Sequence, residues 1–194
     1  MRQKVKLEME YKIFLISVGD VQKTILNEIS SGLQEVFRTI PASILSHNVS
    51  LPRNSFNSYR QQYNSSVILD YLQKLFSFPI QTKVLGVTNV DLYVPELNFV
   101  FGEALLGGNV AVISLKRLFP EFYGHSPNHG LFVSRAVKEA VHELGHNFGL
   151  SHCKNMRCVM HFSNSILDTD IKEKYFCASC RSKLYFLGVE VAQS

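Results

Sequence analysis

One stretch near the C-terminal end restricts what this chain can fold into. Residues 141–165 read VHELGHNFGLSHCKNMRCVMHFSNS and concentrate histidine and cysteine within a few turns of chain. His142 and His146 are four residues apart, so on a helix they lie on the same side, one above the other. Gly149 can adopt the left-handed conformation that ends a helix and turns the chain sharply. We expect this turn to bring His152 back towards the first two histidines.

The pattern HExxHxxGxxH has the parts of a catalytic zinc site. Three neutral imidazoles hold Zn²⁺ at roughly 2.0–2.1 Å and leave a fourth position for water, unlike the closed sites that only stabilise a fold. Glu143 follows His142 directly and can face that water. It would act there as general base in the attack on a carbonyl, and then deliver the proton to the leaving amine. We therefore predict His142, His146 and His152 as zinc ligands, Glu143 as the catalytic base and amide hydrolysis as the reaction.

The four cysteines of the chain predict a second zinc site. They form two close pairs, Cys153-x4-Cys158 and Cys177-x2-Cys180, as in a closed tetrahedral Cys₄ site with ligands at about 2.3 Å. Consecutive side chains of an extended segment point to opposite sides, so His152 can face the catalytic ion while Cys153 faces the structural one. The chain would then bind two Zn²⁺ ions, and loss of the structural ion would weaken the catalytic site.

Alternating strand and helix patterns predict an α/β (α+β) fold with a mixed sheet and helices against it. Asp20 is the expected N-cap of the first helix. Strands are predicted at residues 11–18, 43–51, 84–88, 98–101 and 110–115, helices at 21–37, 66–78, 131–148 and 168–187, and loops at 52–65 and 120–130. The helix over residues 131–148 carries the first two histidines and has an apolar stripe that would face the sheet.

The length of 194 residues suits one domain. We expect an N-terminal lobe over residues 1–149 and a small, helical C-terminal lobe over residues 150–194, which holds the third histidine and the cysteines. The net charge of +4 is scattered rather than gathered in a basic run, which argues against nucleic acid as a partner. No apolar run is long enough to span a membrane, and residues 1–20 resemble a first strand more than a signal peptide. The sequence thus favours a cytoplasmic protein; it does not determine the oligomeric state, for which a monomer is the default expectation.

Taken together, these residues resemble the signature of the archaemetzincins, a branch of the metzincin metallopeptidases. The resemblance rests on His142, Glu143, His146, Gly149, His152, Cys153, Cys158, Met160, Cys177 and Cys180. The segments DLYVPELNFVFGEA (residues 91–104) and SLKRL (residues 114–118) are also similar to that family. The resemblance implies a metzincin-like fold, a methionine turn at Met160 beneath the catalytic zinc, and a peptide substrate. It also implies an edge strand that pairs antiparallel with the substrate, and residues 109–115 occupy the corresponding place in sequence. The same residues fit an ordinary sheet strand equally well.

Three functions remain open on the sequence alone. The favoured one is a zinc metallopeptidase that cleaves peptides or a restricted set of proteins. The second is a non-enzymatic zinc protein whose Cys₄ module binds a partner, and the third is a zinc amidase acting on a small acyl compound. Four further side chains receive no role, because loop histidines are usually solvated and zinc itself can stabilise an oxyanion; they are Tyr123, His125, His129 and Tyr175.

Overall fold

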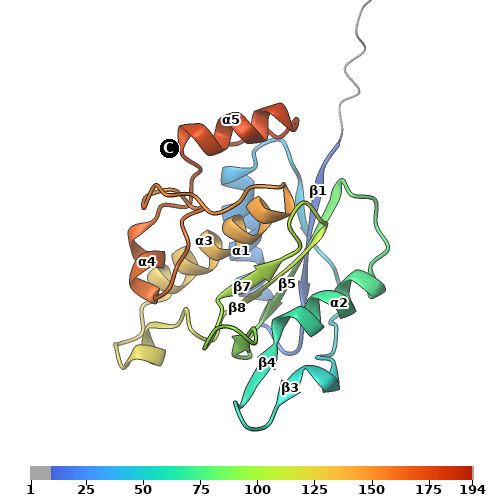
Figure 1. The fold of residues 1–194 in the computed structure, drawn as a ribbon, viewed down its shortest axis with the longest axis vertical. Coiled ribbons are helices and arrows are strands. Elements are labelled where there is room, and N and C mark those ends of the chain that lie inside the picture. Colours follow the sequence, from blue (N-terminus) through green and yellow to red (C-terminus); the bar gives the residue numbers. More distant parts are fainter. Residues whose placement is uncertain (1–9, 194) are drawn as a thin grey trace, which may run out of the picture.

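A five-stranded sheet organises the chain in the computed structural model, which describes residues 10–193 (Figure 1). In chain order its strands are β1 (Lys12–Ser17), β2 (Ala42–Ile44), β5 (Thr82–Thr88), β7 (Gly102–Ala104) and β8 (Val110–Ser114). They lie in the order β2-β1-β5-β8-β7. Strands β2, β1, β5 and β8 run parallel to one another. Strand β7 pairs antiparallel with β8 and forms one edge of the sheet.

The alternation of side chains along the strands divides the interior into two hydrophobic clusters, one on each face. Ile13 and Leu15 of β1 belong to the first cluster, while Ile16 belongs to the second. In β8, Ile113 belongs to the first cluster and Val112 to the second, because successive side chains of a strand point to opposite faces. Strands buried on both faces explain the nearly continuous apolar runs of the sequence.

Helices cover both faces of this sheet. They are α1 (Lys23–Val36), α2 (Ser65–Leu75), α3 (His129–Asn147), α4 (Ile166–Ile171) and α5 (Ala178–Phe186), with short 3₁₀ helices η1 (Arg53–Ser55) and η2 (Pro120–Tyr123). Helices α1 and α3 contribute to the first cluster and α2 to the second. Where α1 crosses α3, a Cβ atom at Gly32 would lie 2.4 Å from Cγ2 of Val137, so glycine permits the close packing of the two helices.

A small second sheet lies beside the main one. It consists of β3 (Phe56–Asn57), β4 (Gln62–Asn64) and β6 (Leu92–Tyr93), in the order β3-β4-β6. Strands β3 and β4 form a hairpin that projects from the bottom of the view in Figure 1. This hairpin falls within residues 52–65, which the sequence predicted as a loop.

The predicted α/β fold with a mixed sheet is confirmed. The helix predicted at 131–148 is α3, displaced by no more than two residues at either end. Segment 150–194 supplies Met160, Phe176 and Leu184 to the same hydrophobic cluster as α1 and α3, and the division into two lobes stays a prediction. Among residues 10–193, no helix combines the length and apolar character needed to cross a membrane.

Several predicted elements are wrong in detail. Helix α1 begins after Gln22, not after Asp20, and no side chain caps its first turn. The second strand covers only β2, followed by a single bridge between Val18 and Val49. The expected helix at 168–187 is two helices, α4 and α5, because the chain between them leaves helical geometry to bring Cys177 to the other cysteines.

The edge strand was also placed wrongly. Residues 109–115 contain β8, which pairs with β5 on one side and with β7 on the other, and all five of its residues are buried. A strand hydrogen-bonded on both sides has no free backbone groups for a peptide. The edge strand next to β8 is β7. The strand predicted at 98–101, just before β7, is wrong, because these residues form only a single bridge between Val100 and Leu92.

Candidate metal centre

The C-terminal half of α3 carries His142 and His146, and the loop that follows carries His152. His142 and Glu143 are almost fully buried, whereas His146 is half-buried. Helix α3 ends at Asn147, and Gly149 follows with a φ of +88°, the left-handed conformation that favours glycine. The amide of Leu150 donates to the carbonyl of Gly145 across this turn. The chain then returns, so that ligand nitrogens of His142, His146 and His152 all lie within 4.8 Å of one another.

The ring orientations of two histidines suit a cation. Nδ1 of His142 lies 2.7 Å from the carbonyl oxygen of Val159, and Nδ1 of His146 lies 2.7 Å from that of Leu150. A carbonyl only accepts, so each Nδ1 carries the proton and each Nε2 keeps a lone pair. The two Nε2 atoms are 3.1 Å apart. Facing lone pairs repel each other unless a cation lies between them, so these residues fit a metal ion.

Desolvation favours the neutral form of all three rings, although His152 itself is largely exposed. Desolvation is the largest cause that lowers the pKa of His142 far below its ordinary value, and it also lowers the pKa of His146 and His152. The charge of Lys172 acts in the same direction on all three. Neutral imidazole is the form that binds metal ions.

Glu143 lies in a cleft of about 390 Å³ that the histidines also line. Burial raises the pKa of its carboxyl well above the usual value, and the nearby carboxylate of Glu139 raises it further. Gly102 of the edge strand passes directly over this side chain. A Cβ atom there would lie 2.6 Å from Oε1 of Glu143, so any residue but glycine at 102 would displace the carboxylate.

A buried ion pair lies one turn before Glu143. Nζ of Lys172 is 2.9 Å from Oε1 of Glu139, and the two side chains are 0% and 3% exposed. The hydroxyl of Thr169 donates to the same oxygen at 3.0 Å. Neighbouring bonds join Arg135 of α3 to Asp170 at 2.7 Å. Together they fasten α3 to α4 and to the chain that follows it, beside the histidine cluster.

Replacing Lys172 with methionine should lower the free energy of unfolding by about 3–5 kcal/mol, because Glu139 would keep a buried charge without its partner. Chemical denaturation of the zinc-loaded protein measures the change. The matched control is Lys174→Met, which removes the more exposed pair with Glu35 and should cost at most about 1 kcal/mol. Equal losses in the two variants would contradict a special role for the buried pair.

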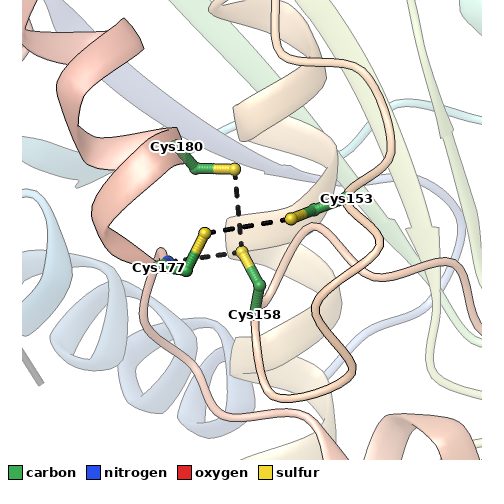
Figure 2. Close-up of side chains that lie close together, drawn as sticks. All are labelled: Cys153, Cys158, Cys177 and Cys180. Carbon is green, nitrogen blue, oxygen red and sulfur yellow. Dashed lines mark hydrogen bonds between the residues drawn. The ribbon is translucent and has the colours of Figure 1, made fainter.

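The four cysteines form a second cluster, in which their side chains point toward one another (Figure 2). Sγ of Cys153 lies 3.8 Å from Sγ of Cys177, and Sγ of Cys158 lies 3.8 Å from Sγ of Cys180. A tetrahedron with metal–sulfur distances of about 2.3 Å has an edge of about 3.8 Å. The thiols are free rather than joined as disulfides. Their spacing therefore fits one Zn²⁺ with four thiolate ligands.

The ionisation of these thiols is uneven. Burial is the largest cause that raises the pKa of Cys158 and Cys180. It acts on Cys177 too, but hydrogen bonds from the backbone of Cys180 and from neighbouring thiols outweigh it and lower the pKa of Cys177 to about 7. Cys177 is the N-cap of α5, so amides at the start of that helix favour its thiolate.

A short segment connects the two clusters. The amide of Cys153 donates to the carbonyl of Met160 at 2.8 Å, and the carbonyl of Cys153 receives Nδ1 of His161 at 3.0 Å. The next carbonyl along the chain from Cys158, that of Val159, orients His142. Met160 is fully buried, and its sulfur would lie 2.3 Å from a Cβ atom at Gly145. The methionine thus packs directly beneath the helical turn between the first two histidines.

The side chains left without a role do not line the cleft. Tyr123 donates to the carbonyl of Arg117 at 2.9 Å, and His129 pairs with Glu28 at 2.8 Å. His125 and Tyr175 line other cavities. The sequence did not single out Gly102, Glu139 or Lys172. Glu139 is three residues before His142, and this helical spacing could have identified it, whereas only the fold places Lys172 beside it.

Comparisons with known proteins agree with this geometry. The model of peptidase family M54 matches residues 4–185. An archaemetzincin of Methanocaldococcus jannaschii is 46% identical over 95% of this chain and 98% of its own length, and one of Pyrococcus furiosus is 42% identical over 91% and 93%. A solved archaemetzincin of Archaeoglobus fulgidus, complexed with malonate, has a TM-score of 0.75 at 39% identity, covering 89% of this chain and 99% of that one. A solved zinc-dependent peptidase of Methanocorpusculum labreanum has a TM-score of 0.80 at 33% identity, with 89% and 99% covered. On these grounds the chain belongs to peptidase family M54, the archaemetzincin family of zinc metallopeptidases.

Proposed function

We propose that this chain hydrolyses peptide bonds with a catalytic Zn²⁺ held by His142, His146 and His152. One observation carries the proposal. The Nδ1 atoms of His142 and His146 are occupied by backbone carbonyls, so their Nε2 lone pairs converge 3.1 Å apart at the floor of an open cleft. Zinc bound there would polarise the scissile carbonyl and make water acidic enough to attack it near neutral pH.

Glu143 would move the proton in this reaction. Its carboxylate lines the same cleft as the three histidines and is held in place between α3 and Gly102 of the edge strand. A carboxylate in this position takes a proton from the attacking water and passes it to the leaving amine. Burial raises the pKa of Glu143, which makes the group a better acceptor in the first step. Glu139 lines the cleft as well, but its charge is balanced by Lys172.

The substrate would lie extended along β7. This strand pairs with β8 on one side, and no other strand of the described chain pairs with its opposite side. Backbone groups there can pair with a peptide, while side chains on either side of the cleft select its residues. Gly102 and Glu103 of β7 line the cleft directly. The peptide's scissile bond would thereby pass over Glu143 and the histidines.

The cysteine cluster would hold a second, structural Zn²⁺. Four thiolates complete the coordination of the ion and leave no position for water or substrate. Met160 would form the methionine turn, supported by its packing against Gly145. Because the segment from Cys153 to Met160 contacts both clusters, we propose that the structural ion also stabilises the catalytic one. Four free cysteines suit a reducing compartment, which supports a cytoplasmic location.

A library of quenched fluorescent peptides tests the proposal. We expect the zinc-loaded protein to cleave a subset of the library, to lose this activity on mild chelation and to regain it when zinc is restored. Metal analysis should give two zinc ions per chain, with one removed by mild chelation because its site is open. A protein with two zinc ions that cleaves no peptide would contradict the peptidase function and leave the metal assignment standing.

A further inference from the structure

A segment of irregular chain forms one wall of the cleft. It comprises residues 94–101, between β6 and β7, and we refer to it as the wall segment. Leu97, Phe99, Val100 and Phe101 of this segment line the same cleft as the three histidines. Leu97 remains 40% exposed, as expected of a side chain placed to meet a ligand. The wall segment therefore contributes four apolar side chains to the lining of the cleft.

Few backbone hydrogen bonds hold the wall segment, and one of them lies at its C-terminal end, where the carbonyl of Phe101 accepts the amide of Ser114 at 2.7 Å. The amide of Leu97 donates to the carbonyl of Val94, and the amide of Val100 donates to that of Leu92. At its tip, the carbonyls of Leu97 and Asn98 each accept a hydrogen bond from Nη2 of Arg60 at 2.9 Å. Arg60 belongs to the β3–β4 hairpin, which is distant in sequence but in contact with the tip of the wall segment. A charged donor that joins two successive carbonyls holds the tip more firmly than a neutral hydrogen bond would.

A second residue of the hairpin reinforces this link. Nε2 of Gln62 donates to the carbonyl of Asn98 at 3.0 Å and to Asp91 at 2.9 Å. Asp91 in turn receives both Nε and Nη2 of Arg117, at 2.6 and 2.7 Å. The guanidinium of Arg117 lies 4.2 Å from the centre of the Phe99 ring. The network thus fastens both the backbone of the wall segment and one of its cleft-lining side chains.

The turn of the hairpin is built to hold Arg60 in one position. Oδ1 of Asn57 accepts hydrogen bonds from the amides of Tyr59 and Arg60, at 3.0 and 3.1 Å. Gln61 has a φ of +54°, the single positive φ of a non-glycine residue among residues 10–193. A strained residue persists only where its surroundings determine it. The guanidinium of Arg60 also stacks over the ring of Tyr93, 4.3 Å from its centre.

We propose that Arg60, supported by Gln62, is a positioning residue that sets the substrate side-chain preference of the cleft from outside it. Arg60 does not line the cleft, so it acts through the wall segment rather than by touching substrate. The inference rests on the proposed peptidase function. It assigns the β3–β4 hairpin a part in substrate binding that its distance from the histidines in sequence does not suggest.

Two inhibitors separate this role from general damage to the site. Acetohydroxamate probes the metal centre alone, whereas a leucyl-phenylalanine hydroxamate adds two apolar side chains that reach the wall. Arg60→Ala should weaken binding of the dipeptide hydroxamate about tenfold, the worth of one charge-assisted hydrogen bond, and leave acetohydroxamate within twofold. Arg60→Lys keeps the charge but lacks the planar guanidinium, so its affinity for the dipeptide hydroxamate should lie between those of the unaltered chain and of Arg60→Ala. Tyr59→Ala is the matched control, because that side chain is 97% exposed in the same turn.

Hydrogen exchange supplies a readout that does not depend on the metal or on activity. The amides of Leu97 and Val100 should exchange faster in Arg60→Ala, while amides of α3 remain unchanged. Unchanged binding of both inhibitors, or equal weakening of both, would overturn the proposal. If the alanine variant does not fold, the lysine variant gives the same comparison. If no peptide of the library were cleaved, only the peptidase function would be contradicted. A selective loss of affinity for the dipeptide hydroxamate in Arg60→Ala would still establish the positioning role.

Discussion

Replacing Glu143 with glutamine should lower kcat/KM for peptide cleavage by about 10²–10⁴-fold and leave two zinc ions bound. Glutamine has nearly the shape of glutamate, so it fits the space beneath Gly102 that the carboxylate occupies. It cannot accept the proton of the attacking water. Because Glu143 is not among the histidine ligand group, the metal content should not change.

The comparison needs a variant that changes charge without touching the cleft. Glu121→Gln, at an exposed position in η2, removes one carboxylate and should retain full activity. Both variants are loaded with zinc and assayed on the same cleaved peptides, with metal content measured in parallel. Turnover that survives in Glu143→Gln would remove the assigned base. Loss of zinc from that variant would instead show that Glu143 supports the metal site, so that loss of activity could not be assigned to proton transfer.

The histidine cluster could be predicted because its geometry is local. A spacing of four residues, a helix and a glycine turn determine where three rings point, and all three conditions are met within eleven residues of chain. The same holds for α3, whose apolar stripe matches its burial on the first hydrophobic cluster. Each of these features depends on backbone geometry that neighbouring residues set by themselves.

The edge strand could not be located in this way. Strand β7 has only three residues, all half-buried, and too short a pattern to distinguish it from a loop. The apolar run over residues 110–113 of β8 is typical of a strand buried on both faces, and such a strand belongs in the interior of a sheet. The family resemblance directed attention to residues 109–115, but an ordinary sheet strand fitted them as well, and the structure shows this second interpretation to be the correct one.

Polar contacts between residues far apart in the sequence could not be predicted either. Arg60 meets its carbonyls 37 and 38 residues further along the chain, and Lys172 meets Glu139 from the far end of α4. Nothing in the spacing of these residues indicates contact, because it depends on how complete elements pack. The wrong prediction of Asp20 as the N-cap of α1 has a related cause. The carbonyl of Asp20 is engaged by the side chain of Asn89, in a loop that only the sheet brings close.

Replacing Cys177 with serine should produce the largest loss of stability. The variant removes one of four ligands, so the zinc content should fall from two ions to one per chain. Binding of a structural zinc contributes directly to folding, with apparent values of about 10–16 kcal/mol in small zinc-binding peptides. The contribution here is smaller because α5 also packs through Leu184, which is fully buried. We therefore expect a folded protein with a strongly reduced melting temperature.

The same variant tests whether the two clusters are coupled. Without the second ion, the segment from Cys153 to Met160 loses its anchor, and with it the Val159 carbonyl that orients His142. Loss of such a supporting contact typically weakens metal binding 10–100-fold, so the remaining zinc should be taken more readily by a competing chelator. Lys154→Ala is the control, since that exposed side chain adjoins Cys153 without being a ligand. A variant that loses the structural ion but holds the remaining zinc as tightly as the unaltered chain would show that the two sites are neighbours without being linked.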